Sequence, residues 1–221
     1  MKKHSLSLSF AALTAFVLWT AAVKSIDVQP NGPQNSSVGF ATLNAFVHSL
    51  TSIHFSLYNI TDWLGLVPLC FMLGFAVLGL AQWIKRKSLL KVDRSLLVLG
   101  AFYLAVILAY AFFESFIINY RPVLIGGVLE ASYPSSTTLL VLTVMPAAAM
   151  QLKKRIQKLS FKKIMIFTID SFIIFMVIGR LLSGVHWFSD IIGGALLSAG
   201  LVGLYASAAK PRSGCSSCQH K

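Results

Sequence analysis

Six hydrophobic stretches, each long enough to cross a lipid bilayer, constrain this chain more than any other feature of its sequence. A helix needs about 20 residues to cross roughly 30 Å of hydrocarbon. Apolar residues make up 56% of the 221 residues and charged residues only 12%. We therefore predict an all-α, polytopic membrane protein built as a bundle of six transmembrane helices. They are expected at about residues 6–23, 63–83, 96–118, 135–151, 164–182 and 187–209.

The first stretch has two interpretations. Lys2 and Lys3 precede its apolar run, as basic residues do in a secretory signal peptide. However, the run is longer than the apolar core of most signal peptides, and Ala21 and Ala22 make a poor cleavage site. These two observations favour a retained helix, which would act as an uncleaved signal anchor.

Basic residues are distributed unevenly among the segments that connect the spans. If the N-terminus is cytoplasmic, 16 of the 19 lysine and arginine residues fall in inner segments. Multi-pass membrane proteins carry this excess on their cytoplasmic side. We therefore expect a cell-membrane protein with both termini in the cytoplasm. The same pattern accounts for the net charge of +12 without nucleic acid as a partner. Arg121 and Arg180 break the rule, because both fall on the outer side.

The pattern also divides the chain, in which no polar stretch is long enough for a second fold. The segment after the first span mixes apolar and polar residues, and an interfacial helix is expected over residues 38–60. His54, Tyr58 and Asp62 recur there every four residues, so they share a helix face. The expected parts are a first transmembrane helix (1–24), an extracytoplasmic segment (25–62), a five-helix core that carries the chemistry (63–209) and a cytoplasmic tail (210–221).

A charged cluster lies at the outer edge of the membrane between the last two spans. Ionisable groups at membrane depth are costly, and they mark functional sites. His186 and Asp190 are one helical turn apart, so the carboxylate is placed to orient the imidazole. Arg180 offers a planar fork of donors that suits phosphate oxygens. A histidine held by a carboxylate can act as a nucleophile or a base.

Two further outer stretches have chemistry that complements this cluster. Arg121 and Pro122 follow the third span, and Pro134, Ser135 and Ser136 open the fourth. A helix N-terminus presents free backbone N–H groups, and these bind anions. Because all three stretches fall on one side of the membrane, we expect them to converge on a phosphoryl group.

These stretches resemble the three motifs of the membrane-bound type 2 phosphatidic acid phosphatase superfamily, K-x6-R-P, P-S-G-H and S-R-x5-H-x3-D. The resemblance covers about residues 60–209 and keeps the family's order and intervals. It implies a lipid phosphatase or diphosphatase that acts on outer-leaflet lipid phosphates, such as polyprenyl diphosphate or phosphatidic acid, without a metal or other cofactor.

The resemblance also implies a role for each matching residue. His186 would attack phosphorus to form a phosphohistidine, and Asp190 would orient it. The phosphoryl oxygens would be held by Arg121, Arg180, Ser135 and the backbone at Ser136.

Three positions depart from the family pattern. The family lysine falls at Glu114, the serine before the family arginine is Gly179, and the histidine that protonates the leaving group falls at Thr137. Three interpretations stay open. In the first, the substrate is a diphosphate, whose leaving group has less need of a proton. In the second, another group supplies the proton, and we hypothesise that this group is His54. In the third, the site binds or transports a lipid phosphate without hydrolysing it. The sequence leaves the oligomeric state open.

The cysteines carry a weaker signal. Cys70 falls inside a span and is expected to pack as a small hydrophobic residue. Cys215 and Cys218 form a C-x-x-C pair with His220 nearby, but a closed zinc site needs four ligands. A tail whose cysteine thiols stay reduced is the preferred interpretation, and metal binding is the alternative.

Overall fold

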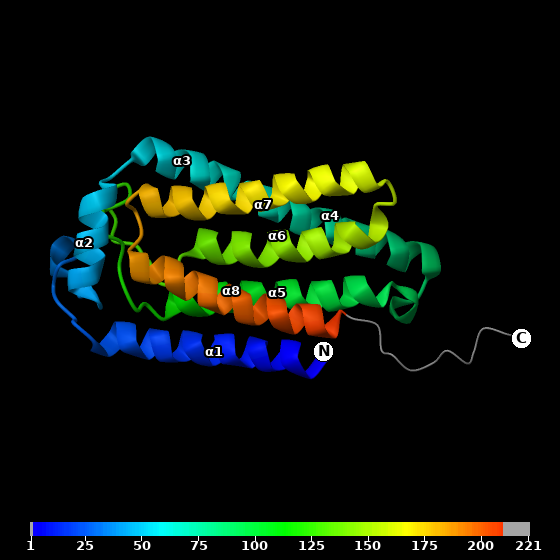
Figure 1. Ribbon diagram of the computed structural model, residues 1–221, viewed down its shortest axis with the longest axis horizontal. Helices are drawn as coiled ribbons and strands as arrows, with labels where there is room; N and C mark the ends of the chain where they lie inside the picture. The colour runs from blue at the N-terminus through cyan, green and yellow to red at the C-terminus, as the bar shows by residue number, and fades with distance from the viewer. Residues whose placement is uncertain (1, 210–221) are drawn as a thin grey trace, which may run out of the picture.

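Long helices lie side by side along the longest axis of the molecule (Figure 1). The structure is a computed structural model, and it describes residues 2–209. The helices are α1 (Lys2–Ser25), η1 (Pro33–Asn35), α2 (Ala41–Thr51), α3 (Phe55–Leu64), α4 (Leu66–Arg86), η2 (Leu89–Lys91), α5 (Arg94–Ser115), α6 (Ser136–Arg155), α7 (Leu159–Leu182) and α8 (Phe188–Ala208).

Five helical stretches of the described residues are long and apolar enough to cross a membrane. They are Ser5–Ser25, Phe55–Arg86, Arg94–Ser115, Leu159–Leu182 and Phe188–Ala208. The predicted all-α membrane fold is therefore confirmed. The sixth long helix, α6, contacts α4, α5, α7 and α8, and it lies in the middle of the bundle in Figure 1. Because α6 packs against protein on several sides, its polar residues Thr138, Thr143 and Gln151 are buried in the bundle.

Helix α1 packs closely along α8 (Figure 1). A Cβ atom added at Gly203 would lie 2.2 Å from Ser9 Oγ, so the close approach requires a glycine there. Trp19 Nε1 donates a hydrogen bond to the Ser189 carbonyl at 3.0 Å. The first apolar stretch is thus part of the helix packing and reaches the first turn of α8.

The segment expected to form one interfacial helix over residues 38–60 forms two instead. Helices α2 and α3 are separated by a break at Ser52, whose φ of +56° is incompatible with a continuing helix. Helix α2 lies across one end of the bundle, and α3 packs along α7 (Figure 1). Hydropathy did not reveal the break, because the apolar pattern continues through it.

The two ends of the bundle differ in their connections. The end with α2 also holds the segment between α5 and α6 and the turn between α7 and α8 (Figure 1). The opposite end holds the α4–α5 and α6–α7 connections, which carry basic residues such as Lys91 and Lys158. The tail that contains Cys215, Cys218 and His220 lies outside the described residues.

Candidate active site

Four side chains identified from the sequence lie together at the α2 end of the bundle. Arg121 comes from the segment between α5 and α6, and Arg180 from the last turn of α7. His186 lies in the turn that leads into α8, and Asp190 in the first turn of α8. All four are buried, with exposed fractions of 8% or less. The chain thus brings two cations, an imidazole and a carboxylate out of water at one place.

The carboxylate of Asp190 accepts hydrogen bonds at both oxygens. Oδ2 accepts from the Trp187 backbone N–H at 2.9 Å and from the Ser132 hydroxyl at 2.5 Å. Oδ1 accepts from Asn119 Nδ2 at 3.4 Å. The Asn119 amide is oriented by the Gly39 N–H, which donates to its oxygen at 3.2 Å. A carboxyl group surrounded by donors in this way acts only as an acceptor, which is the chemistry of the ionised form.

His186 does not contact Asp190 directly. The distance from His186 Nδ1 to Asp190 Oδ2 is 3.9 Å, which is too long for a hydrogen bond. Instead, His186 Nδ1 lies 3.0 Å from the hydroxyl oxygen of Ser132. The other ring nitrogen, Nε2, is buried and has no hydrogen-bond partner within the described residues. The expected orienting contact from Asp190 therefore passes through a serine.

Burial and nearby positive charge both favour the neutral form of His186. Burial lowers its pKa well below the ordinary value, and the charges of Arg121 and Arg180 lower it further. A neutral imidazole has one protonated nitrogen and one with a free lone pair. Because Nε2 makes no hydrogen bond, it is the nitrogen available to act as a nucleophile.

Arg180 is held by helix α3. Its Nη1 donates to the Tyr58 carbonyl at 3.5 Å and the Thr61 hydroxyl at 3.3 Å, and Nη2 lies 3.4 Å from Asp62 Oδ1. The guanidinium also stacks over the Tyr58 ring, 4.8 Å from its centroid. Its Nε has no hydrogen-bond partner among the described residues, so one buried N–H can bond to a ligand. Tyr58 and Asp62, which share a face of α3 as their spacing predicts, therefore contact an arginine.

Arg121 is less fully bonded than Arg180. Its Nε lies 3.1 Å from Glu130 Oε2, but in the part of the chain that the structure describes both Nε and Nη1 lack a hydrogen bond. The guanidinium carbon is 5.9 Å from the centroid of the Tyr58 ring. The Tyr58 ring is therefore close to both arginines. Buried donors without partners are rare, and those of Arg121 are suited to anionic oxygens.

The start of α6 presents its first turn to the same region. Ser135 caps the helix, with its oxygen accepting from the hydroxyl of Thr138 at 3.0 Å and from the Thr138 N–H at 3.5 Å. Its backbone N–H donates to the carbonyl of Asp190 at 3.1 Å, which fixes α6 against α8. Ser136 and Thr137 are half-buried and line adjoining cavities. Ser135 is thus engaged in capping, whereas Ser136 faces open space.

His54 is exposed to the surroundings, unlike the four residues of the buried cluster. It precedes α3, its side chain is exposed, and its backbone N–H donates to the Ser183 carbonyl at 3.0 Å.

Sequence reasoning missed Ser132 and Asn119, which lie in an irregular segment where no periodic pattern marks a buried polar side chain. The four-residue spacing of Tyr58 and Asp62 was the available signal for α3.

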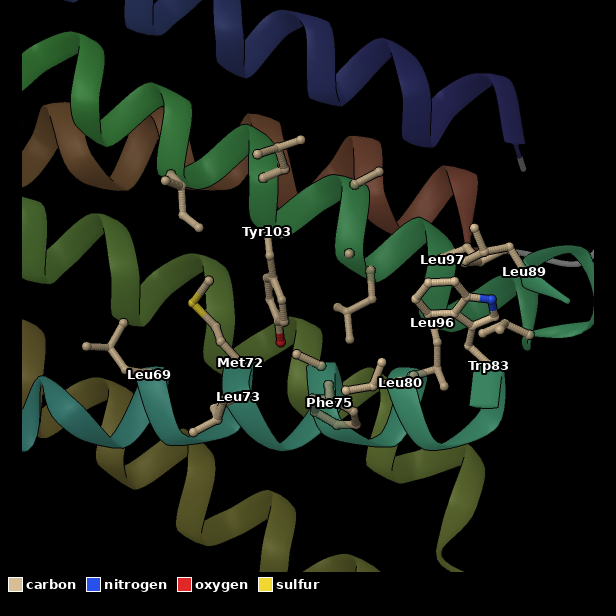
Figure 2. Close-up of a pocket in the computed structure, with 18 residues that line it drawn as sticks. Leu69, Met72, Leu73, Phe75, Leu80, Trp83, Leu89, Leu96, Leu97 and Tyr103 are labelled. Carbon is tan, nitrogen blue, oxygen red and sulfur yellow. The ribbon is translucent and has the colours of Figure 1, made fainter. Parts of the chain in front are cut away.

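Three cavities adjoin one another from the site to the opposite end of the bundle. The first, about 430 Å³, is polar, and Arg121, Glu114 and Ser136 are among its lining residues. The second, about 390 Å³, shares Ser136 with the first and includes Thr137. The third is a groove of about 700 Å³ between α4 and α5 with a mainly apolar lining, and Leu69 lines both it and the second. Figure 2 shows the groove, with apolar side chains of the two helices projecting into it.

The fold and the site together define a multi-pass membrane protein with a buried cluster of two arginines, a histidine and a carboxylate. Residues 98–213 match the sequence profile of the PAP2 superfamily, which is more than half of the chain. The chain therefore belongs to the PAP2 superfamily, and the predicted family is confirmed. It has no significant match among curated proteins.

The fold is similar to the crystal structure of a solved relative. That structure is described as the first transmembrane PAP2 type phosphatidylglycerolphosphate phosphatase from Bacillus subtilis. The likeness has a TM-score of 0.63 at 20% sequence identity, and it covers 90% of this chain and 94% of the other. At this identity the likeness establishes the fold alone.

Packing explains one of the three departures from the family motifs. A Cβ atom at Gly179 would lie 2.9 Å from Thr61 Cγ2, because α3 packs closely against α7 there. A serine at this position would push the two helices apart. Glu114, by contrast, is exposed and lines the polar cavity, and Thr137 is half-buried and lines the second cavity. Packing does not account for either of these departures.

Proposed function

We propose that this protein hydrolyses a lipid phosphate ester or a lipid diphosphate, with His186 as the nucleophile. One observation carries the proposal. His186 Nε2 and the Nε atoms of Arg121 and Arg180 are all buried without hydrogen-bond partners in the described part of the chain. A free lone pair beside unpaired cationic donors matches an electrophilic phosphorus with anionic oxygens.

The reaction follows from that arrangement in two steps. In the first, the lone pair of His186 Nε2 forms a bond to phosphorus, and the leaving oxygen departs with the electron pair of the broken P–O bond. Arg121 and Arg180 hold the non-bridging oxygens, where charge develops. In the second, water attacks the phosphohistidine, the P–N bond breaks, and phosphate leaves with His186 regenerated.

The proton on the leaving group decides which lipids react well. An alkoxide leaving group requires a proton donor, which contributes roughly 10²–10⁴ to a rate. At the family position for that donor stands Thr137, whose hydroxyl is a poor acid. A departing phosphate needs the proton much less. The arrangement therefore favours a lipid diphosphate over a lipid monophosphate.

The cavities support a lipid substrate. The groove between α4 and α5 is mainly apolar, and it adjoins the cavity lined by Ser136 and Thr137. Helix α4 has 21 residues, a length of about 30 Å. A hydrocarbon chain lying in this groove would leave its phosphate near the first turn of α6.

The alternative is a protein that binds or transports lipid phosphates without hydrolysing them. Glu114 and Thr137 favour it, because one places a negative charge at the polar cavity and the other removes the expected acid. The free Nε2 of His186 favours the enzyme, because binding alone does not require an unpaired nucleophile.

One assay separates the two functions. Purified protein and the His186→Ala variant are given a panel of lipid monophosphates and diphosphates, and released phosphate is measured. We expect release by the wild type alone, fastest with a diphosphate. Equal release by the two proteins on every substrate would exclude the enzyme.

The basic residues favour an active site on the outer side of the membrane. A thiol reagent that does not cross membranes tests this placement in intact cells. In a background without the native cysteines, a cysteine at exposed Val128 should react, whereas one at exposed Lys158 should not. The reverse pattern would place the site inside.

A further inference from the structure

Ser132 occupies the space between the two residues that the proposed reaction pairs. Its oxygen is 2.5 Å from Asp190 Oδ2 and 3.0 Å from His186 Nδ1, whereas the latter two atoms are 3.9 Å apart. Ser132 is 2% exposed and comes from the segment between α5 and α6, whereas His186 lies in the turn before α8 and Asp190 in the first turn of α8. Its backbone N–H donates to the Asn119 carbonyl at 2.9 Å, which fixes its position.

Counting protons assigns the direction of each hydrogen bond. The Asp190 carboxylate is surrounded by donors, namely the Trp187 N–H and the Asn119 amide in addition to Ser132. The one hydroxyl proton of Ser132 therefore points to Asp190. The serine oxygen is left as an acceptor, so the proton between Ser132 and His186 belongs to Nδ1.

We propose that Ser132 is a positioning residue that relays the orienting contact of Asp190 to His186, holding the imidazole with Nδ1 protonated and Nε2 free. This inference rests on the proposed function, and it adds a residue outside the three motifs to the site. A direct carboxylate–imidazole hydrogen bond is absent here, and the serine takes its place. Without the hydroxyl, the 3.9 Å gap would leave the Nδ1–H unpaired and the ring free to adopt the other tautomer.

The relay predicts a specific kinetic pattern. Ser132→Ala should lower kcat about 10- to 100-fold, the range for losing a hydrogen bond to a charged network. KM should stay within about twofold, because the hydroxyl is committed to Asp190 and His186 rather than to substrate. Ser132→Thr keeps a hydroxyl and should restore most of kcat. Ser198→Ala is the matched control, since Ser198 is a buried serine of α8 that bonds only to backbone carbonyls.

A second measurement does not depend on turnover. Nitrogen-15 NMR of labelled histidine reports which ring nitrogen carries the proton, and the His186 signal is assigned by its loss in His186→Ala. The wild type and Ser198→Ala should show a protonated Nδ1 and a bare Nε2. Ser132→Ala should shift toward the other tautomer while its thermal unfolding midpoint stays close to that of Ser198→Ala.

The outcomes separate the two proposals. If the wild type hydrolyses no substrate, the proposed function fails, and the NMR tautomer still decides the relay. The relay is overturned if the wild type has the proton on Nε2, or if Ser132→Ala matches Ser198→Ala in kcat and tautomer.

Discussion

Asp62 and Arg180 form an ion pair in which Asp62 is exposed and Arg180 is buried. Arg180 Nη2 lies 3.4 Å from Asp62 Oδ1, and their side chains are 1% and 55% exposed, respectively. The pair joins α3 to α7 at the candidate phosphate site. An incoming phosphate would compete with Asp62 for the guanidinium.

This competition predicts that Asp62→Asn binds phosphate more tightly. A half-exposed ion pair contributes up to about 1 kcal/mol, so the Kd for orthophosphate should fall roughly two- to fivefold. Calorimetric titration in detergent measures it. Asp170→Asn is the control, because Asp170 is an exposed carboxylate of α7 about 15 Å from Arg180 along the helix. Weaker binding by Asp62→Asn would contradict a competing role for Asp62.

Restoring an acid at residue 137 should raise hydrolysis of monophosphates. Thr137 lines a cavity of about 390 Å³, which has room for an imidazole. Thr137→His should increase kcat on a lipid monophosphate at least about tenfold, with a smaller gain on a diphosphate. Thr137→Gln supplies a polar side chain of similar size without the acid. If the two variants have equal rates, the missing proton does not limit the reaction.

The close packing between α1 and α8 predicts that a larger side chain at Gly203 lowers the stability of the protein. Gly203→Val would drive its Cβ into Ser9, whereas Gly100 on α5 has nothing within 4 Å of a built Cβ. Both changes introduce the same residue into a long apolar helix. Gly203→Val should lose about 1–3 kcal/mol of stability and unfold at a lower temperature than Gly100→Val. Equal midpoints would mean that α1 does not pack as described.

The lowered pKa of His186 predicts how stability depends on pH. In the unfolded chain, histidine takes up a proton as pH falls through about 6.5, whereas buried His186 stays neutral until its lowered pKa is reached. The unfolded state therefore binds more protons in this window, and the free energy of unfolding falls as pH drops below about 6.5.

Replacing His186 should remove this contribution. His186 changes the free energy of unfolding by at most about 1.4 kcal/mol per pH unit. Unfolding midpoints of the wild type and His186→Gln, measured from about pH 7.5 down to about pH 5.5 (one unit either side of the ordinary histidine pKa of about 6.5), should change with pH at different rates. Parallel slopes would show that His186 titrates normally in the folded protein.

Hydropathy and charge predicted much of the fold, because the bilayer demands long apolar helices. The weakest of these predictions was α6, which is less apolar than the five stretches that could span a membrane, and whose contacts with α4, α5, α7 and α8 bury its polar residues. The break at Ser52 escaped prediction because a local φ of +56° leaves no trace in the apolar pattern.

The distribution of basic residues among the connecting segments places four residues at one end of the bundle, so their grouping could be expected: Arg121, Arg180, His186 and Asp190. Ser132 could not be identified, because a buried serine in an irregular segment looks like any surface serine. The sequence indicated that Asp62 shares a helix face with Tyr58, but which partner it meets depends on how α3 packs against α7.

A phosphoryl group trapped on His186 would test the proposed reaction most directly. Wild-type protein is mixed with a lipid diphosphate, quenched in alkali to preserve the acid-labile P–N bond, digested and analysed by mass spectrometry. We predict one added phosphoryl group on the peptide that contains His186, lost on treatment with acid and absent in His186→Ala. Phosphate release by the wild type with no modified peptide, or with the same modification in His186→Ala, would contradict His186 as the nucleophile.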